Sequence, residues 1–148
     1  MNGRLVACLA ALCVAWPVAG QRGTEWQAGA VGALSSSTYM GAGASWARRA
    51  GRVRASLGAT VGALDAQAAA RGEVLLGYVL TPGRRRGAGV YAVGGVAVTG
   101  TADAHTERLV AALGIEGTPG GRRGWFLEVG VGGGVRVAAG YRWRTLRR

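Results

Sequence analysis

Hydrophobic residues alternate one by one with small or polar residues along most of the chain. In residues 52–63 the odd positions carry only alanine, valine and leucine, whereas the even positions carry arginine, serine, threonine and glycine. A period of two over this length is typical of a β-strand rather than a helix, and it exceeds most strands of soluble proteins. The same alternation predicts eight strands, within residues 26–34, 40–46, 52–64, 74–80, 90–98, 109–115, 125–131 and 135–143.

A repeated turn motif indicates where these strands end. Residues 81–83 read Thr-Pro-Gly and precede an arginine pair, and residues 118–120 repeat both features 37 positions later. A further step of 37 towards the N-terminus reaches Arg48 and Arg49, without the Thr-Pro-Gly. Pro-Gly and Arg-Arg-Gly between apolar runs are turn signals, and the repeat leaves room for one strand out and one back. We therefore predict a meander of hairpins with arginine-bearing turns on one side, formed by Arg48, Arg49, Pro82, Gly83, Arg85, Arg86, Pro119, Gly120, Arg122 and Arg123.

The second face of the predicted strands carries glycines and charges. If the apolar face formed a soluble core, that core would be mostly alanine and valine and would bury little area. A closed barrel in lipid reverses the faces, because its apolar side chains meet hydrocarbon while its narrow interior holds small residues and paired charges. The pattern thus predicts an all-β, eight-stranded antiparallel up-and-down transmembrane β-barrel. Its lumen charges are expected to be Arg52, Arg54, Glu73, Glu116, Glu128, Arg136 and Arg142.

The last predicted hairpin allows one ion pair to be named. With its turn centred on Gly134, Glu128 lies opposite Gly140 and diagonal to Arg142, within reach of a long side chain. We therefore expect a Glu128–Arg142 ion pair. Such pairs would plug the lumen, because an eight-stranded barrel is only wide enough to hold side chains.

Aromatic residues gather at one end of the predicted strands, on the side of the arginine turns and both termini. Trp26 faces Trp46 in a hairpin centred on Ser36, and Trp125 faces Trp143 in the hairpin centred on Gly134. Membrane barrels place such residues at the membrane–water interface. The predicted aromatic girdle comprises Trp26, Trp46, Tyr78, Trp125, Tyr141 and Trp143.

The first twenty residues have the composition of a secretory signal. Arg4 precedes an apolar run that ends at Pro17, and small residues follow at 18–20. We predict a cleaved signal peptide at 1–20 and an outer-membrane β-barrel at 21–148. Cys8 and Cys13 are the only cysteines and would leave with the signal, so the mature chain would have no disulfide. The formal net charge of +11, with arginine as the only basic residue besides one histidine, suits an anionic partner such as lipid headgroups.

In its strand pattern, signal, terminus-side turns and girdle, the chain resembles the small eight-stranded outer-membrane β-barrels of the OmpA and OmpX type. The resemblance covers about residues 24–144 and is one of pattern. It implies insertion in the outer membrane by the barrel-assembly machinery. The chain departs from the family in continuing past Trp143 through residues 144–148, and in its short far-side turns. Only 65–71 and 99–107 are expected to form longer loops there.

Candidate chemistry is sparse. His105 stands in a predicted loop with Asp103 and Glu107, but no serine lies near it in sequence, so we predict no catalytic residue, metal or cofactor. The arginine clusters have no interleaved aromatics, which argues against nucleic acid as a partner. We expect a monomeric, porin-like membrane protein with a structural or envelope role. Two alternatives stay open: a lipid A-modifying outer-membrane enzyme, and a secreted cationic β-barrel that binds an anionic ligand.

Overall fold

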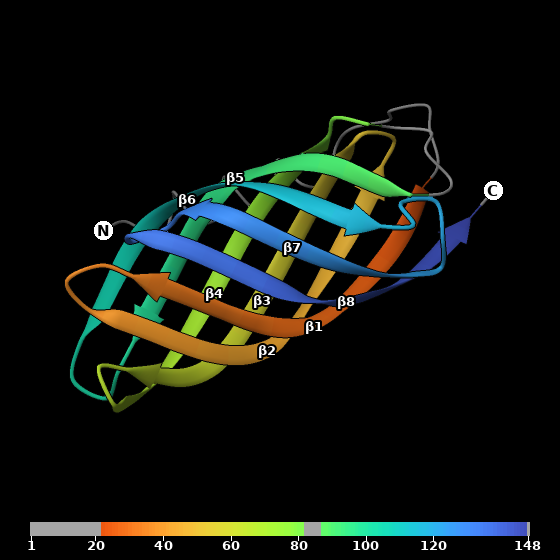
Figure 1. The fold of residues 1–148 in the computed structure, drawn as a ribbon. Coiled ribbons are helices and arrows are strands. Elements are labelled where there is room, and N and C mark those ends of the chain that lie inside the picture. The colour runs from red at the N-terminus through yellow and green to blue at the C-terminus, as the bar shows by residue number, and fades with distance from the viewer. Residues whose placement is uncertain (1–21, 82–86, 148) are drawn as a thin grey trace, which may run out of the picture.

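A computed structural model describes residues 22–81 and 87–147, and every regular element in these ranges is a β-strand. The predicted signal peptide, Pro82, Gly83, Arg85 and Arg86 lie outside the described residues. Eight strands follow in chain order: β1 (Arg22–Leu34), β2 (Thr38–Ala50), β3 (Val53–Leu64), β4 (Gln67–Val79), β5 (Ala88–Gly100), β6 (His105–Gly117), β7 (Arg123–Val131) and β8 (Val135–Arg147). Each pairs antiparallel with the next, and β8 pairs with β1 to close the barrel (Figure 1).

The two faces of the strands are reversed relative to a soluble protein, as the alternation predicts. Large apolar side chains point outward; Leu57 is 60% exposed and Leu109 is 79% exposed. The largest fully buried side chains include Arg136, Arg142 and Glu116. Closure leaves every strand paired on both edges, which is what a sheet in hydrocarbon requires. The predicted fold class is therefore confirmed.

The connections are shorter than predicted at the end of the barrel where β1 ends and β8 begins, which we call the distal end. β4 begins at Gln67, so the loop expected at 65–71 is only a two-residue turn, Asp65-Ala66. Both residues have positive φ, 47° and 70°, as in the hairpin turns that match strand twist. The side chain of Asp65 stabilises the turn by accepting a 2.7 Å hydrogen bond from the backbone N–H of Thr38. β6 begins at His105, which likewise shortens the loop expected at 99–107.

At the opposite end, where β1 begins and β8 ends, one predicted turn is displaced. We call this the terminal end. Arg48 and Arg49 belong to β2, and the chain reverses at Gly51, which has φ 60°, and Arg52. Arginine can continue a strand, whereas the reversal needs a residue that tolerates positive φ. In the β6–β7 connection, Pro119, Gly120 and Arg122 lie in the turn as predicted, and Arg123 is the first residue of β7.

The register of the first hairpin agrees with its predicted centre, but that of the last does not. Trp26 pairs with Trp46 across β1 and β2. Across β7 and β8, Trp125 pairs with Tyr141 rather than Trp143. The turn reverses one residue earlier than predicted, because Gly133 and Gly134 both adopt positive φ, and a run of glycines does not specify where the reversal occurs.

Candidate functional site

The interior of the barrel is the candidate site, because alternation directs charged side chains from six of the eight strands into it. β2 and β5 contribute none of these charges. Nine charged side chains lie there: Glu25, Arg54, Arg71, Glu73, Glu116, Glu128, Arg136, Arg142 and Arg144. Tyr39, Tyr91, Gln27 and Thr99 are buried among them. Burial of this many charges is tolerated only when they are paired.

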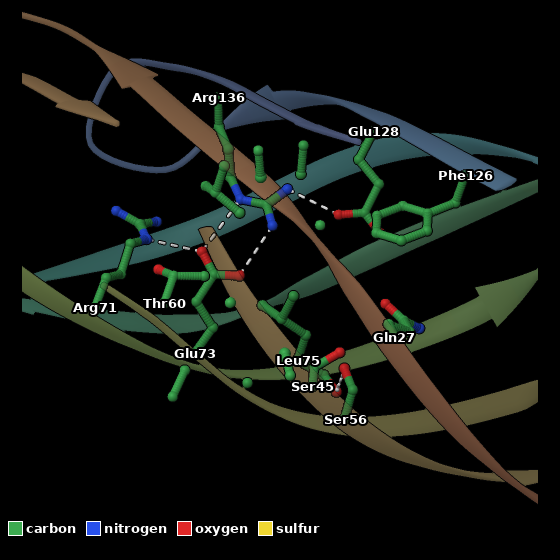
Figure 2. A pocket seen from close by; sticks show the side chains of 18 of the residues that line it. Gln27, Ser45, Ser56, Thr60, Arg71, Glu73, Leu75, Phe126, Glu128 and Arg136 are labelled. Carbon is green, nitrogen blue, oxygen red and sulfur yellow. Dashed lines mark hydrogen bonds and ion pairs between the residues drawn. The ribbon is translucent and has the colours of Figure 1, made fainter. Parts of the chain in front are cut away.

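The distal cluster consists of Arg71, Glu73, Glu128 and Arg136. Arg136 reaches between the two carboxylates, as Figure 2 shows; its Nη2 donates to Glu73 Oε2 at 2.9 Å, and its Nη1 donates to Glu128 Oε2 at 2.8 Å. Arg71 Nε donates to Glu73 Oε1 at 2.8 Å, and its other nitrogens donate to Thr99 and to the backbone of Gly132. Two arginines therefore balance two glutamates, so this cluster has no net charge.

The terminal cluster consists of Glu25, Arg54, Glu116, Arg142 and Arg144. Glu25 accepts from Arg144 Nε at 2.6 Å and from Arg54 Nη1 at 3.1 Å. Glu116 accepts from both Arg142 and Arg144. Three arginines stand against two glutamates, so each carboxylate bridges at least two guanidinium groups and the cluster carries one excess positive charge.

Tyr91 joins the two clusters. Its hydroxyl donates to Glu128 Oε1 at 2.9 Å and accepts from Arg142 Nη2 at 3.0 Å. The guanidinium groups of Arg54 and Arg142 each lie 5.0 Å from the centre of its ring, a favourable cation–π distance. Arg54 also approaches Glu128 at 3.7 Å. The lumen thus contains one continuous hydrogen-bonded network.

The predicted Glu128–Arg142 ion pair is wrong. Because the β7–β8 register is shifted, Glu128 lies opposite Ala138 and diagonal to Arg136, which becomes its partner. Arg142 binds Glu116 instead and reaches Glu128 only through Tyr91. The prediction that Arg52 faces the lumen is also wrong, since Arg52 lies exposed in the β2–β3 turn and contacts the Tyr78 hydroxyl. The other six predicted lumen charges do lie together inside the barrel: Arg54, Glu73, Glu116, Glu128, Arg136 and Arg142.

Sequence reasoning missed four members of this network. Glu25 and Tyr91 each alternate with predicted outward residues, so continuing the period of two would have found them. Arg71 was assigned to a loop that is shorter than expected. Arg144 was assigned to the tail, although β8 runs to Arg147 and pairs with β1 over its full length.

A cavity of about 60 Å³ lies beside the distal cluster. Gln27, Ser45, Ser56 and Thr60 line it together with the ion-paired residues (Figure 2). Its volume suits a few water molecules, for which the polar side chains in its lining offer hydrogen-bond partners. A second space of about 10 Å³ lies beside Arg142, whose Nε has no hydrogen-bond partner among the described residues.

Other candidate chemistry does not assemble in the described ranges. His105 is the exposed first residue of β6. Among residues 22–81 and 87–147, no three His, Cys, Asp or Glu side chains are close enough to hold a metal ion. The described part of the chain also contains no helix that could span a membrane.

The six predicted girdle residues all lie on the outer face near the terminal end: Trp26, Trp46, Tyr78, Trp125, Tyr141 and Trp143. Each is at least 40% exposed. Arg48, Arg122 and Arg123 are exposed at the same end, and Arg49 is half-buried there. Aromatic rings and cations thus share one rim of the barrel.

One comparison with solved structures supports this architecture. The chain is similar to the N-terminal β-barrel domain of Pseudomonas aeruginosa OprF, with a TM-score of 0.64 and 13% sequence identity, over 85% of this chain and 99% of that one. No protein-family model and no curated protein sequence matches the chain. At this identity the likeness is one of fold, so the chain shares the eight-stranded barrel fold of that domain.

Proposed function

We propose that the protein is an integral outer-membrane β-barrel with a structural role in the envelope and a lumen closed by its ion-pair network. The observation that carries this proposal is the reversal of the two faces. Apolar side chains such as Leu57, Val61 and Leu109 cover the outside, and exposing so much apolar surface to water would be unfavourable. A bilayer would bury this surface, and the aromatic rim would lie at its interface.

The closed lumen follows from the pairing of its charges. All four lumen glutamates contact arginine at 3.1 Å or less, and Tyr39, Tyr91 and Phe126 fill space between them. The cavity that is left has a volume of about 60 Å³, which is room for a few waters. Because each carboxylate is held by guanidinium groups, none is free to act as a general acid or base, which supports a role without enzymatic activity.

The terminal end is proposed to face the periplasm. Its arginines would meet the anionic headgroups of the inner leaflet, each contributing about 1 kcal/mol of attraction. Insertion would require the barrel-assembly machinery after export by the cleaved signal, and the barrel would be a monomer with no nucleic-acid partner. These assignments rest on the charge of the rim and on the fold.

Two measurements test the membrane proposal. The detergent-extracted protein should migrate differently on gels before and after heating, because a folded barrel resists detergent. In intact cells, a cysteine introduced at Ala104 should react with an impermeant maleimide, while one at Gly120 in the terminal-end turn should not. Recovery of the protein in the soluble fraction would refute the membrane location, and labelling at Gly120 alone would invert the orientation.

A third measurement tests the closed lumen. Vesicles that contain the purified barrel should swell no faster in small sugars than vesicles without protein, and a large-pore porin serves as the positive control. Swelling at a rate comparable to the porin would show that the lumen conducts solutes. That result would be compatible with the membrane location, but it would refute the proposal that the ion-pair network closes the lumen.

A further inference from the structure

The outward aromatic side chains gather on one wall of the barrel instead of encircling it. Five of the six lie on the four neighbouring strands β7, β8, β1 and β2, and only Tyr78 on β4 lies elsewhere. We call these five the aromatic wall: Trp26, Trp46, Trp125, Tyr141 and Trp143. Aromatic residues that only anchor a barrel at the membrane–water interface need not lie on neighbouring strands. The clustering in the aromatic wall therefore needs a separate explanation.

The strand register makes the wall continuous. Trp143 pairs with Trp26, and Trp26 pairs with Trp46, which puts three indoles in a row across three strands. Trp125 pairs with Tyr141 beside them. The rings of Tyr141 and Trp143 meet edge to face, with centroids 5.3 Å apart. Directly paired residues have Cβ atoms about 4.5–5.5 Å apart, so these aromatic side chains start from adjacent positions on neighbouring strands.

Polar groups that suit a phosphate flank the wall. Arg123 pairs with Trp143 at one side, and Arg48 follows Trp46 on the outer face of β2 at the other. Both arginines are exposed. Thr145 pairs with Thr24, which pairs in turn with Arg48, so two hydroxyl groups share a row with Arg48, next to the row in which Arg123 pairs with Trp143. A guanidinium group can bind phosphate oxygens through two parallel hydrogen bonds, and a hydroxyl group can donate one more.

No acidic residue opposes these arginines. The sequence has seven, and all lie in the described ranges. Four are inside the lumen, and the other three, Asp65, Asp103 and Glu107, are at the distal end. Among the described residues, the charged side chains on the outer surface around the aromatic wall are therefore all cationic.

We propose that the aromatic wall is a binding site for an anionic glycerophospholipid. Arg48 and Arg123 lie on strands three apart, so each holds the phosphate group of its own lipid, while the rings pack against the glycerol and the upper acyl chains. This inference rests on the proposed membrane location. A second copy of the chain fits less well, because a two-fold interface through this wall would bring the arginines of both copies together.

Intrinsic fluorescence reports on this site directly. Four of the five tryptophans belong to the wall, and the fifth, Trp16, lies in the predicted signal peptide. The purified mature barrel is placed in phosphatidylcholine vesicles, and bromine-labelled phosphatidylglycerol or bromine-labelled phosphatidylcholine is added as a quencher. The relative association constant should favour phosphatidylglycerol by at least about fivefold, the ratio that corresponds to one arginine near an anionic headgroup.

Arginine variants separate a local site from general surface charge. In the double variant Arg48→Gln/Arg123→Gln, the ratio of the association constants for phosphatidylglycerol and phosphatidylcholine should fall close to one. The matched control is Arg52→Gln, which removes an exposed charge at the same end, but beside Tyr78 on the other side of β3, and should keep the preference. Equal affinity for the two lipids in the unmodified protein, or an equal loss in Arg52→Gln, would overturn the site. Failure of both lipids to quench would refute the membrane location as well.

Discussion

The outer and inner faces of this barrel come from the same strands and are held by different interactions. On β3, Leu57 points outward and is exposed, whereas Arg54 points inward and contacts Glu25 and Glu128. An outward side chain contacts the medium around the barrel, and its contribution to stability depends little on any single neighbouring side chain. Each inward charge depends on at least one other charged side chain. The outside should therefore tolerate changes that keep its apolar character, and the inside should respond to changes in any member of the network.

The largest expected effect is the loss of a lumen carboxylate that bridges two arginines. Glu116→Gln would leave Arg142 and Arg144 short of a counter-charge, and we expect a loss of about 3–5 kcal/mol in unfolding free energy. Denaturant unfolding of the barrel in vesicles, followed by tryptophan fluorescence, measures it. The control Glu107→Gln, exposed near the distal end of the same strand, should change stability by about 0.5 kcal/mol or less. Similar values for both variants would mean that the lumen charges are solvated.

A charge introduced on the outer face should lower the unfolding free energy nearly as much, for a different reason. Leu57→Arg would put a guanidinium into hydrocarbon, which destabilises membrane barrels by about 2–4 kcal/mol. Leu57→Met keeps the size and apolar character and should cost less than about 1.5 kcal/mol. The same unfolding measurement in vesicles compares the two. If the arginine variant is as stable as the methionine variant, Leu57 faces water and the outer face has been misassigned.

Glycines on the two faces offer a finer comparison. A Cβ at Gly114 would overlap the buried ring of Tyr91, whereas a Cβ at Gly72 would meet nothing within 4 Å. Gly114→Ala should therefore cost about 1–3 kcal/mol through crowding of the lumen. Gly72→Ala should be neutral or slightly stabilising, because alanine loses less backbone entropy in a strand. The unfolding midpoints of the two variants test this, and an unchanged midpoint for Gly114→Ala would indicate a lumen with free space.

The smallest expected effect distinguishes direct from indirect pairing within the lumen. A double-mutant cycle with Glu128→Gln and Arg136→Gln should give a coupling energy within about 0.5–3 kcal/mol, because these side chains contact each other. The cycle with Glu128→Gln and Arg142→Gln should give a smaller coupling, because Tyr91 lies between them. A larger coupling in the second cycle would restore the pairing expected from a turn centred on Gly134.

The outer face was predictable because the type of each residue and its place in the alternation are enough to assign it. Leu57, Val129 and Trp26 follow from the alternation alone, and their neighbours matter little to the assignment. The lumen was predicted as a set of charges but not as a set of partners. Glu128 illustrates the difference: its inward direction follows from alternation, but its partner depends on where three consecutive glycines reverse the chain.

The sequence by itself therefore determined the number of strands, their direction, the face that most residues occupy and the end of the barrel that carries arginine and tryptophan. These properties follow from a local period and from turn residues, which act over a few positions. Only the tertiary structure decided that Glu25 and Arg144 meet, although 119 positions separate them, and that five aromatic residues form one wall. Those contacts depend on closure between β1 and β8 and on the register of each hairpin, and a one-residue change in a turn centre moves every partner beyond it.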